Sequence, residues 1–267
     1  DDGCNAAFSP VRKGGLVTRA LDIDAIRAEF PILSRRVNGR PLAYLDNAAS
    51  AQTPDAVLNA MTDQAHTAYA NVHRGLHTLA NETTAAFENA REIVRAFLNA
   101  PDASNIIFTK GGTEAINLVA NGIAGDISPG DEIVLSVMEH HSNIVPWHFL
   151  RERYGAVLKW VEILEDGSLD MESLREQVSS KTRMVALTHM SNVLGSITDV
   201  TEATRIAHSV GAKILVDGCQ AGVHLDIDVQ EIGCDFYVLT GHKIYGPSGV
   251  GALFGTTEAL RSLRPYQ

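Results

Sequence analysis

The chain has 267 residues, and its 22 Lys and Arg against 32 Asp and Glu give a formal net charge of −10. With 45% hydrophobic and 20% charged residues it has ordinary globular composition, and its length suits one large domain or two modest ones without disulfide staples. The acidic balance argues against nucleic acid or an anionic membrane as the main partner.

The cysteines and the apolar runs indicate the cellular compartment of the protein. Cys4, Cys219 and Cys234 form no C-x-x-C pair and no zinc spacing, which favours a reducing compartment. No apolar run approaches the ~20 residues of a membrane span, and no apolar signal segment opens the chain. His73 and His77 have the spacing of zinc ligands on a helix, but Gly75 lies between them and H-E-x-x-H is absent. We therefore expect a soluble cytoplasmic protein without a metal site.

The first hundred residues predict helices. Residues 1–20 are mixed and without period, so we expect a mobile N-terminal arm. A short helix is predicted over 21–30, ended by Pro31. Apolar residues spaced by three and four predict amphipathic helices over 55–69 and 82–98. The segment PLAYLDNAAS, between the first two helices, ends in small residues that would let the backbone approach a ligand or a partner.

The rest of the chain alternates short apolar runs with helix-length stretches. The predicted strands are residues 105–109, 132–137, 157–161, 184–188, 213–217, 235–239 and 250–254. This alternation predicts an α/β fold in which helices cover both faces of a parallel sheet. Only ten residues, TGHKIYGPSG, separate the last two strands, barely a minimal parallel crossover. The last strand is therefore predicted to be antiparallel to the sixth.

Polar or glycine-rich segments follow five of the predicted strands. They are KGGTE (110–114), EHHSN (139–143), HMSN (189–192), DGCQ (217–220) and TGHK (240–243). Ligands of open α/β sheets bind at the carboxyl ends of the strands, so we expect these segments to converge on one site.

Each segment taken alone also has a structural interpretation. Gly111-Gly112-Thr113 before a helix can be a simple turn or an anion site at the helix N-terminus. Asp217 can be structural, although a buried carboxylate needs a cation or several donors. Lys243 can be a solvated lysine, and His140 a capping residue. Taken together, an anion cup, a buried carboxylate and a lysine are what pyridoxal phosphate requires.

Residues 21–267 resemble the SufS-type (group II) cysteine desulfurases, which are class V, fold-type I pyridoxal-phosphate enzymes. The matching stretches, in order, are YLDNAASAQTP, ANVHRGLHTLA, GGTEAINLVA, MEHHSNIVPW, THMSNVLG, VDGCQA and LTGHKIYGPSGVGAL. The resemblance implies a three-layer large domain over 21–267, with a helical N-terminal segment and a seven-stranded, mostly parallel sheet whose last strand is antiparallel.

The resemblance also implies residue roles. Lys243 would form the Schiff base with the cofactor and remove the substrate proton, while His140 would stack on the ring and move protons. Asp217 would pair with the ring nitrogen, and Gln220 would hydrogen-bond the ring hydroxyl. Gly112, Thr113, Thr240 and His242 would hold the phosphate, Asn192 would lie near the hydroxyl and the substrate carboxylate, and Ala48 and His73 would line the substrate entrance.

The implied activity is conversion of L-cysteine, or L-selenocysteine, to L-alanine, with sulfur passed to an enzyme cysteine as a persulfide for iron–sulfur cluster assembly. A homodimer and a sulfur-acceptor protein of the SufE or SufU type are implied partners. The sequence departs from the pattern of this family in three places. Cys219 stands where a small residue such as alanine is expected, GGT replaces G-T-T or G-A-T, and the chain stops at Gln267, before the small domain that carries the attacking cysteine and a substrate-binding arginine. We therefore expect no turnover by this chain, with Cys219 a small buried hydrophobe.

Three other functions remain open. Another class V enzyme, such as a selenocysteine lyase, a kynureninase-like hydrolase or an epimerase, would share most of these residues. A dinucleotide-binding oxidoreductase would need G-x-G-x-x-G after the first strand, and that motif is absent there. A catalytically silent sulfur carrier or scaffold would not need Lys243 and Asp217.

Overall fold

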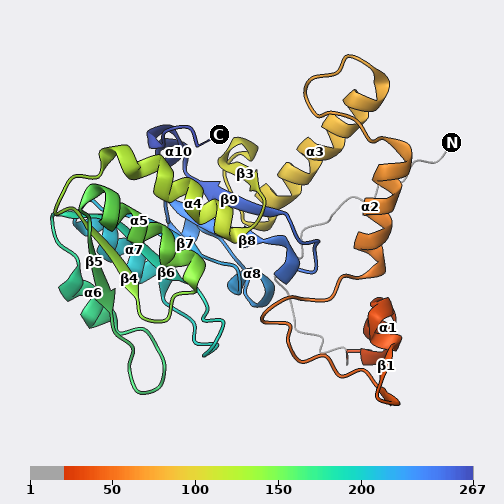
Figure 1. Ribbon diagram of the computed structural model, residues 1–267, viewed down its shortest axis with the longest axis horizontal. Coiled ribbons are helices and arrows are strands. Elements are labelled where there is room, and N and C mark those ends of the chain that lie inside the picture. The colour runs from red at the N-terminus through yellow and green to blue at the C-terminus, as the bar shows by residue number, and fades with distance from the viewer. Residues whose placement is uncertain (1–20, 267) are drawn as a thin grey trace.

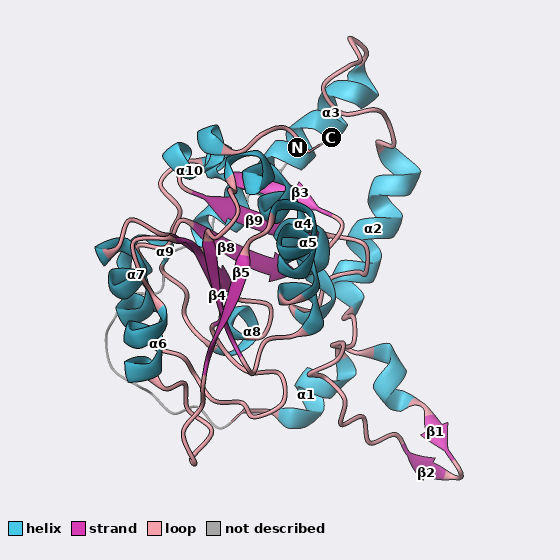
Figure 2. Ribbon diagram, turned by 60° about the vertical axis from the view of Figure 1, so that its left-hand side comes forward, coloured by secondary structure: helices cyan, strands magenta, loops and turns pink. Residues whose placement is uncertain are grey.

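The computed structural model describes residues 21–266, so the arm expected over residues 1–20 lies outside the described residues. A seven-stranded sheet with helices on both faces forms the centre of the molecule (Figures 1 and 2). Its strands are β3 (Ile106–Thr109), β4 (Glu132–Ser136), β5 (Val157–Val161), β6 (Thr182–Thr188), β7 (Lys213–Asp217), β8 (Phe236–Thr240) and β9 (Gly251–Gly255). All seven predicted strands are present within two residues of their expected ends, and the predicted α/β class is confirmed.

The strands lie in the order β3-β9-β8-β7-β6-β4-β5. Strands β5, β4, β6, β7 and β8 pair in parallel, whereas β9 is antiparallel to both of its neighbours, β8 and β3. The antiparallel direction expected from the short last connection is confirmed. Because β9 lies between β8 and β3, the carboxyl ends of β3 and β8 stay at the same edge of the sheet.

Ten α-helices are present in the described part of the chain. They are α1 (Ile23–Ala28), α2 (Asp55–Thr67), α3 (Thr78–Phe97), α4 (Gly112–Ile123), α5 (Val145–Tyr154), α6 (Met171–Gln177), α7 (Val200–Ser209), α8 (Ala221–His224), α9 (Val229–Ile232) and α10 (Thr257–Ser262). Helix α3 begins four residues before the predicted helix, because the His77 ring accepts a hydrogen bond from the Ala80 N–H and caps the helix there. Over residues 21–266, no helix combines the length and the apolar character needed to cross a bilayer.

The sheet separates two apolar cores. Helices α4, α5 and α10 pack on one face, and α6, α7 and α9 on the other. Successive residues of β6 alternate between the cores: Met184 and Ala186 face the first, and Val185 and Leu187 the second, all fully buried. This two-sided burial explains why the central strands read as continuous apolar runs instead of an alternation.

The N-terminal elements stand away from the sheet. Helices α1 and α2 bury no residue, and with the outer part of α3 they extend to one side of the molecule (Figures 1 and 2). A hairpin that the sequence analysis missed, β1 (Arg36–Val37) and β2 (Arg40–Pro41), joins α1 to the rest. Its turn is Asn38-Gly39, with φ of 52° and 73°, and Asn-Gly is a strong two-residue hairpin signal.

Candidate active site

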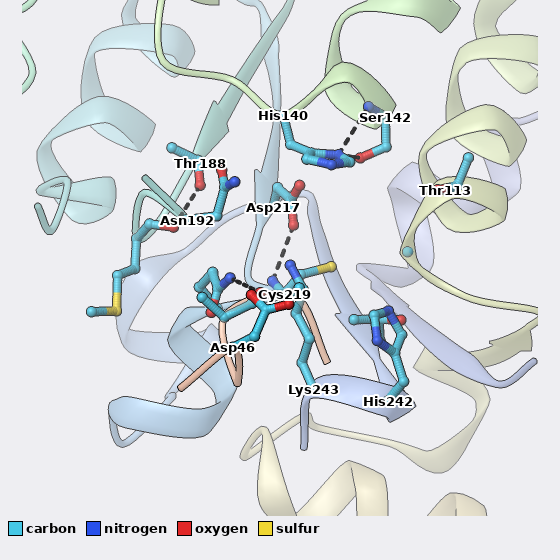
Figure 3. A pocket seen from close by; sticks show the side chains of 16 residues that line it. Asp46, Thr113, His140, Ser142, Thr188, Asn192, Asp217, Cys219, His242 and Lys243 are labelled. Atoms are coloured by element: carbon cyan, nitrogen blue, oxygen red, sulfur yellow. Dashed lines mark hydrogen bonds between the residues drawn. The ribbon is translucent and has the colours of Figure 1, made fainter. Parts of the chain in front are cut away.

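A cavity of about 390 Å³ opens at the carboxyl ends of the parallel strands (Figure 3). Ten of the residues proposed from the sequence line it: Ala48, Gly112, Thr113, His140, Asn192, Asp217, Gln220, Thr240, His242 and Lys243. The expected convergence of five strand ends therefore occurs. The lining residues that the sequence analysis did not propose for the site are Asp46, Ala49, Ser142, Thr188, Met190 and Cys219.

The N-terminus of α4 forms one end of the cavity. Gly111 precedes the helix with φ 152° and ψ 177°, a conformation that is essentially restricted to glycine. Within residues 21–266 no side chain caps this twelve-residue helix, so its first N–H groups have no side-chain acceptor there. Open N–H groups at the positive end of a helix suit an anion such as phosphate.

The β7 strand ends at Asp217, which lines the cavity (Figure 3). The residue is only 5% exposed, and its Oδ1 accepts a hydrogen bond from the Cys219 N–H at 3.0 Å. Lys243 lines the same cavity, and within residues 21–266 its amine has no hydrogen bond or ion pair. A buried carboxylate and a free amine thus line one cavity. The carboxylate could pair with a cationic ring, and the amine could react with a carbonyl group.

The loop that carries Lys243 is held from two sides. The Gly241 N–H donates to the Val250 carbonyl, and the Ala51 N–H donates to the His242 carbonyl, each at 2.9 Å. Beside it, the Gln220 Nε2 donates to the Ala48 carbonyl at 2.7 Å. The small residues of PLAYLDNAAS therefore let their backbone approach the cavity wall, and they fix Gln220 and the lysine loop together.

His140 lies across the cavity from Lys243 (Figure 3). Its Nδ1 lies 2.8 Å from the Ser142 Oγ and accepts a hydrogen bond from the Ser142 N–H, which fixes the ring. Burial lowers the pKa of His140 below its ordinary value, and the positive charge of Lys243 lowers it further. A neutral imidazole results, able to lie against a flat ligand and to exchange a proton at Nε2.

Glu139 forms a buried network directly behind His140. Its Oε1 lies 2.5 Å from the Ser136 Oγ and accepts from the Thr188 N–H at 2.9 Å, while its Oε2 accepts from Asn143 Nδ2 at 2.7 Å. Burial, with a smaller contribution from the charge of Asp217, raises the pKa of Glu139 to about 8. Sequence reasoning missed this acid, although a glutamate at the end of an apolar strand was a signal.

His73 lies apart from the cavity. Its Nε2 pairs with Glu88 Oε1 at 2.8 Å, and its ring packs edge-on against Phe87 of α3. His73 is in the loop before α3 and His77 caps that helix, so the two do not share a helix face. In the described part of the chain, no group of three or more His, Cys, Asp or Glu is arranged to hold a metal ion.

The two described cysteines are free thiols. Cys219 is half-buried and lines the cavity, and Cys234 is buried in the core beside β8. Burial raises the pKa of both thiols well above the ordinary value, and the carboxylate of Asp217 contributes at Cys219. Both are therefore neutral at pH 7 and poor nucleophiles.

The description of the family model that matches residues 43–267 is aminotransferase class-V. The chain belongs to the class V aminotransferase family. A curated relative, the cysteine desulfurase of Dickeya dadantii (strain 3937), is 50% identical over 246 residues, which cover 92% of this chain and 60% of the relative. The chain thus spans about three fifths of the length of this class V relative.

Two solved structures of cysteine desulfurases are similar to the folded chain. The cysteine desulfurase CsdA (S-sulfonic acid) from Escherichia coli matches with a TM-score of 0.83 and 40% identity, covering 93% of this chain and 61% of that one. The apo cysteine desulfurase from Thermococcus onnurineus NA1 matches with a TM-score of 0.85 and 34% identity, covering 91% and 59%. The predicted fold-type I architecture is confirmed by these neighbours.

Class V enzymes use pyridoxal phosphate, and the donor set of the cavity fits it. The cavity offers an uncapped helix N-terminus for an anionic group, a buried carboxylate for a ring nitrogen and an unpaired lysine for a carbonyl carbon. A neutral imidazole faces the space between them.

Asp217→Asn should weaken pyridoxal phosphate binding about tenfold to a hundredfold. The amide keeps an oxygen that can accept from the Cys219 N–H but carries no charge, and one hydrogen bond to a charged group is worth roughly 1.5–3 kcal/mol. An absorbance titration of the chain with pyridoxal phosphate measures the dissociation constant. Asp166→Asn, at an exposed turn, is the control and should bind as the parent does. Equal affinity in Asp217→Asn and the parent would remove this carboxylate from the site.

Proposed function

We propose that this chain is the cofactor-binding part of a cysteine desulfurase of the SufS type. The enzyme would convert L-cysteine to L-alanine and transfer the sulfur to a cysteine as a persulfide. The observation that carries the proposal is the convergence of Lys243, Asp217 and His140 on one cavity, in a chain half identical to a protein named cysteine desulfurase.

Each end of the cavity would hold one part of the cofactor. Asp217 would pair with the ring nitrogen, His140 would cover one face of the ring, and Gln220 would reach the ring hydroxyl. The open N–H groups of α4 would hold the phosphate, with the side chains of Thr113, Thr240 and His242. When bound, pyridoxal phosphate supplies an electron sink that weakens the bonds at the α-carbon of an amino acid.

Two groups of the chain would move protons. The Lys243 amine lacks a hydrogen-bond or ion-pair partner over residues 21–266, so it is free to take the proton from the substrate α-carbon. The His140 Nδ1 accepts from the Ser142 N–H, so the neutral ring carries its proton on Nε2, which can donate that proton and take it back. Asn192 and Ala48 line the cavity and would contact the substrate.

The sulfur would leave the site on another protein group. Cys219 and Cys234 are unsuited to take it, because burial raises the pKa of both thiols. We propose that the acceptor is a SufE- or SufU-type protein after the persulfide has formed, and that the reaction serves iron–sulfur cluster assembly in the cytoplasm. The apolar side chains of Leu58 and Met61 are exposed on α2, and this exposure fits a homodimer in which the partner subunit covers the helix.

The proposal is tested by measuring the alanine released from L-cysteine, and the sulfide released when an added thiol reductant cleaves the persulfide. We expect the 267-residue chain to bind pyridoxal phosphate but to release no alanine above background, because the raised pKa keeps both of its described thiols neutral. A version extended to the length of the curated relatives is expected to release both products. Cys219→Ala should leave the background of the short chain unchanged. Turnover by the short chain that Cys219→Ala abolishes would contradict the assignment of this thiol, and an extended protein inactive on cysteine would overturn the function.

A further inference from the structure

Cys219 and Gly112 touch at the floor of the cavity. A β-carbon placed on Gly112 would lie 2.6 Å from the Cys219 Sγ, a distance at which one of the two groups must shift. Its other neighbours, Val238 Cγ1 at 3.4 Å and Thr240 Cβ at 3.7 Å, are in ordinary van der Waals contact. Among these three neighbours, the sulfur is therefore the one that would have to shift to admit a side chain at position 112.

The backbone of Gly112 does not require glycine. Gly112 is the first residue of α4, and its φ lies outside the left-handed region, unlike that of Gly111. Alanine is intrinsically the better helix residue by about 1 kcal/mol. The absence of a side chain at this position is thus explained by the thiol packed on it.

This contact joins the two ends of the cavity. The N–H of Cys219 donates to Asp217 Oδ1, and its side chain packs against the core that α4 shares with the sheet. Gly112 opens α4, whose first N–H groups form the other end of the cavity. Figure 3 places the Cys219 thiol in the cavity, close to Asp217 and Lys243. A ligand that binds both ends requires a fixed separation between Asp217 and the α4 N-terminus.

We propose that Cys219 is a positioning residue whose sulfur, packed on Gly112, sets the spacing between Asp217 and the anion-binding N-terminus of α4. The proposal rests on the assignment of the cavity to pyridoxal phosphate. The thiol acts through its volume, and no bond to it forms or breaks. Residues 112 and 219 share one space, so a gain of volume at one position is tolerated only with a loss at the other.

The test is a double-mutant cycle on pyridoxal phosphate affinity. Gly112→Ala should raise the dissociation constant about tenfold or more, because the new methyl group displaces the helix N-terminus from the sulfur. Cys219→Ala alone should raise it by about threefold to tenfold, because the first residue of α4 loses the sulfur on which it rests. Gly112→Ala with Cys219→Ala should return within about threefold of the parent, because the methyl group then occupies the space of the sulfur.

Two further measurements separate positioning from mere packing. The free energy of unfolding of each variant in urea, without cofactor, reports packing, and the dissociation constant with the absorbance maximum of the bound cofactor reports the site. The matched control is Gly112→Ala with Cys234→Ala, which removes a buried thiol away from the cavity and should not restore affinity. If Gly112→Ala does not fold, recovery of both fold and affinity in the double variant supports the proposal.

Additive effects on the dissociation constant, in a parent that binds pyridoxal phosphate, would overturn the positioning role. Coupling confined to the free energy of unfolding, with no coupling in affinity, would overturn it as well. A parent chain that fails to bind pyridoxal phosphate would instead overturn the proposed function, so the two failures are distinguishable.

Discussion

Lys243→Ala is expected to abolish covalent attachment of pyridoxal phosphate to the chain and to leave the fold intact. Lys243 is the one lysine among the described residues that line the cavity, and within residues 21–266 its amine makes no hydrogen bond or ion pair. Removing the side chain therefore breaks no hydrogen bond or ion pair among the described residues. Borohydride reduction of the chain mixed with pyridoxal phosphate, followed by peptide mass spectrometry, measures the attachment.

The matched control is Lys181→Ala, which removes an exposed lysine on the loop before β6. It should keep attachment at the level of the parent. Circular dichroism and urea unfolding should give the same result for the parent and both variants. A borohydride-reducible adduct in Lys243→Ala at the level of the parent would show that another amine holds the cofactor.

Much of this site could be predicted because it depends on topology. The parallel strands are buried on both faces, so their sequences are continuous apolar runs whose ends are easy to find. Polar residues directly after those runs, such as Asp217 and Asn192, must meet at one edge of the sheet. The fold and the gathering of nine of the ten proposed residues follow from that rule, whereas Ala48, which follows none of these strands, was proposed from the resemblance.

What could not be predicted depends on contacts between segments distant in sequence. Gly112 and Cys219 each departed from the expected pattern, but only the folded chain brings the sulfur against the helix N-terminus. The direction of β9 followed from a short connection, while its place between β8 and β3 depends on which edge of the sheet was open. His73 was assigned to the substrate entrance by resemblance; in this chain it pairs with Glu88 of α3, outside the cavity.

Glu139 shows the same limit for a charged group. Its position after β4 was visible in the sequence, but its partners come from three places: the end of β4, the turn after His140 and the end of β6. These hydrogen bonds tie the turn that carries His140 to the neighbouring strand. The state of this acid therefore affects both the stability of the chain and the placement of the imidazole.

The contribution of Glu139 to the free energy of unfolding should fall between about pH 4.5 and pH 8, and Glu139→Gln should remove that contribution. The pKa of Glu139 is raised by burial from its ordinary 4.5 to about 8. In this window the folded chain keeps a proton that the unfolded chain has released, so stability decreases as the pH rises. One pKa unit corresponds to about 1.4 kcal/mol, which makes the loss several kcal/mol. Glutamine does not titrate.

Urea unfolding of the parent and Glu139→Gln at pH 5, 6, 7 and 8 measures the difference. At pH 5 the variant should be about 1 kcal/mol less stable, because its amide nitrogen cannot accept from whichever donor it faces, the Thr188 N–H or the Asn143 Nδ2. By pH 8 it should equal or exceed the parent. His189, whose burial lowers its pKa to about 4, makes stability rise with pH between about 4 and 6.5, but equally in both proteins. The difference between them therefore isolates Glu139.

Glu165→Gln, at an exposed position, is the control and should follow the parent at every pH. If the free energy of unfolding of Glu139→Gln runs parallel to that of the parent from pH 5 to pH 8, the acid ionises in the folded chain at its ordinary pKa. Ser136, Asn143 and the Thr188 N–H would then serve as three donors to a carboxylate, and glutamine should destabilise the chain by a constant amount from pH 5 to pH 8. The difference in free energy of unfolding between the parent and Glu139→Gln must therefore be followed across the pH range. Its pH dependence, and not its size at one pH, decides whether Glu139 is protonated or ionised in the buried network behind His140.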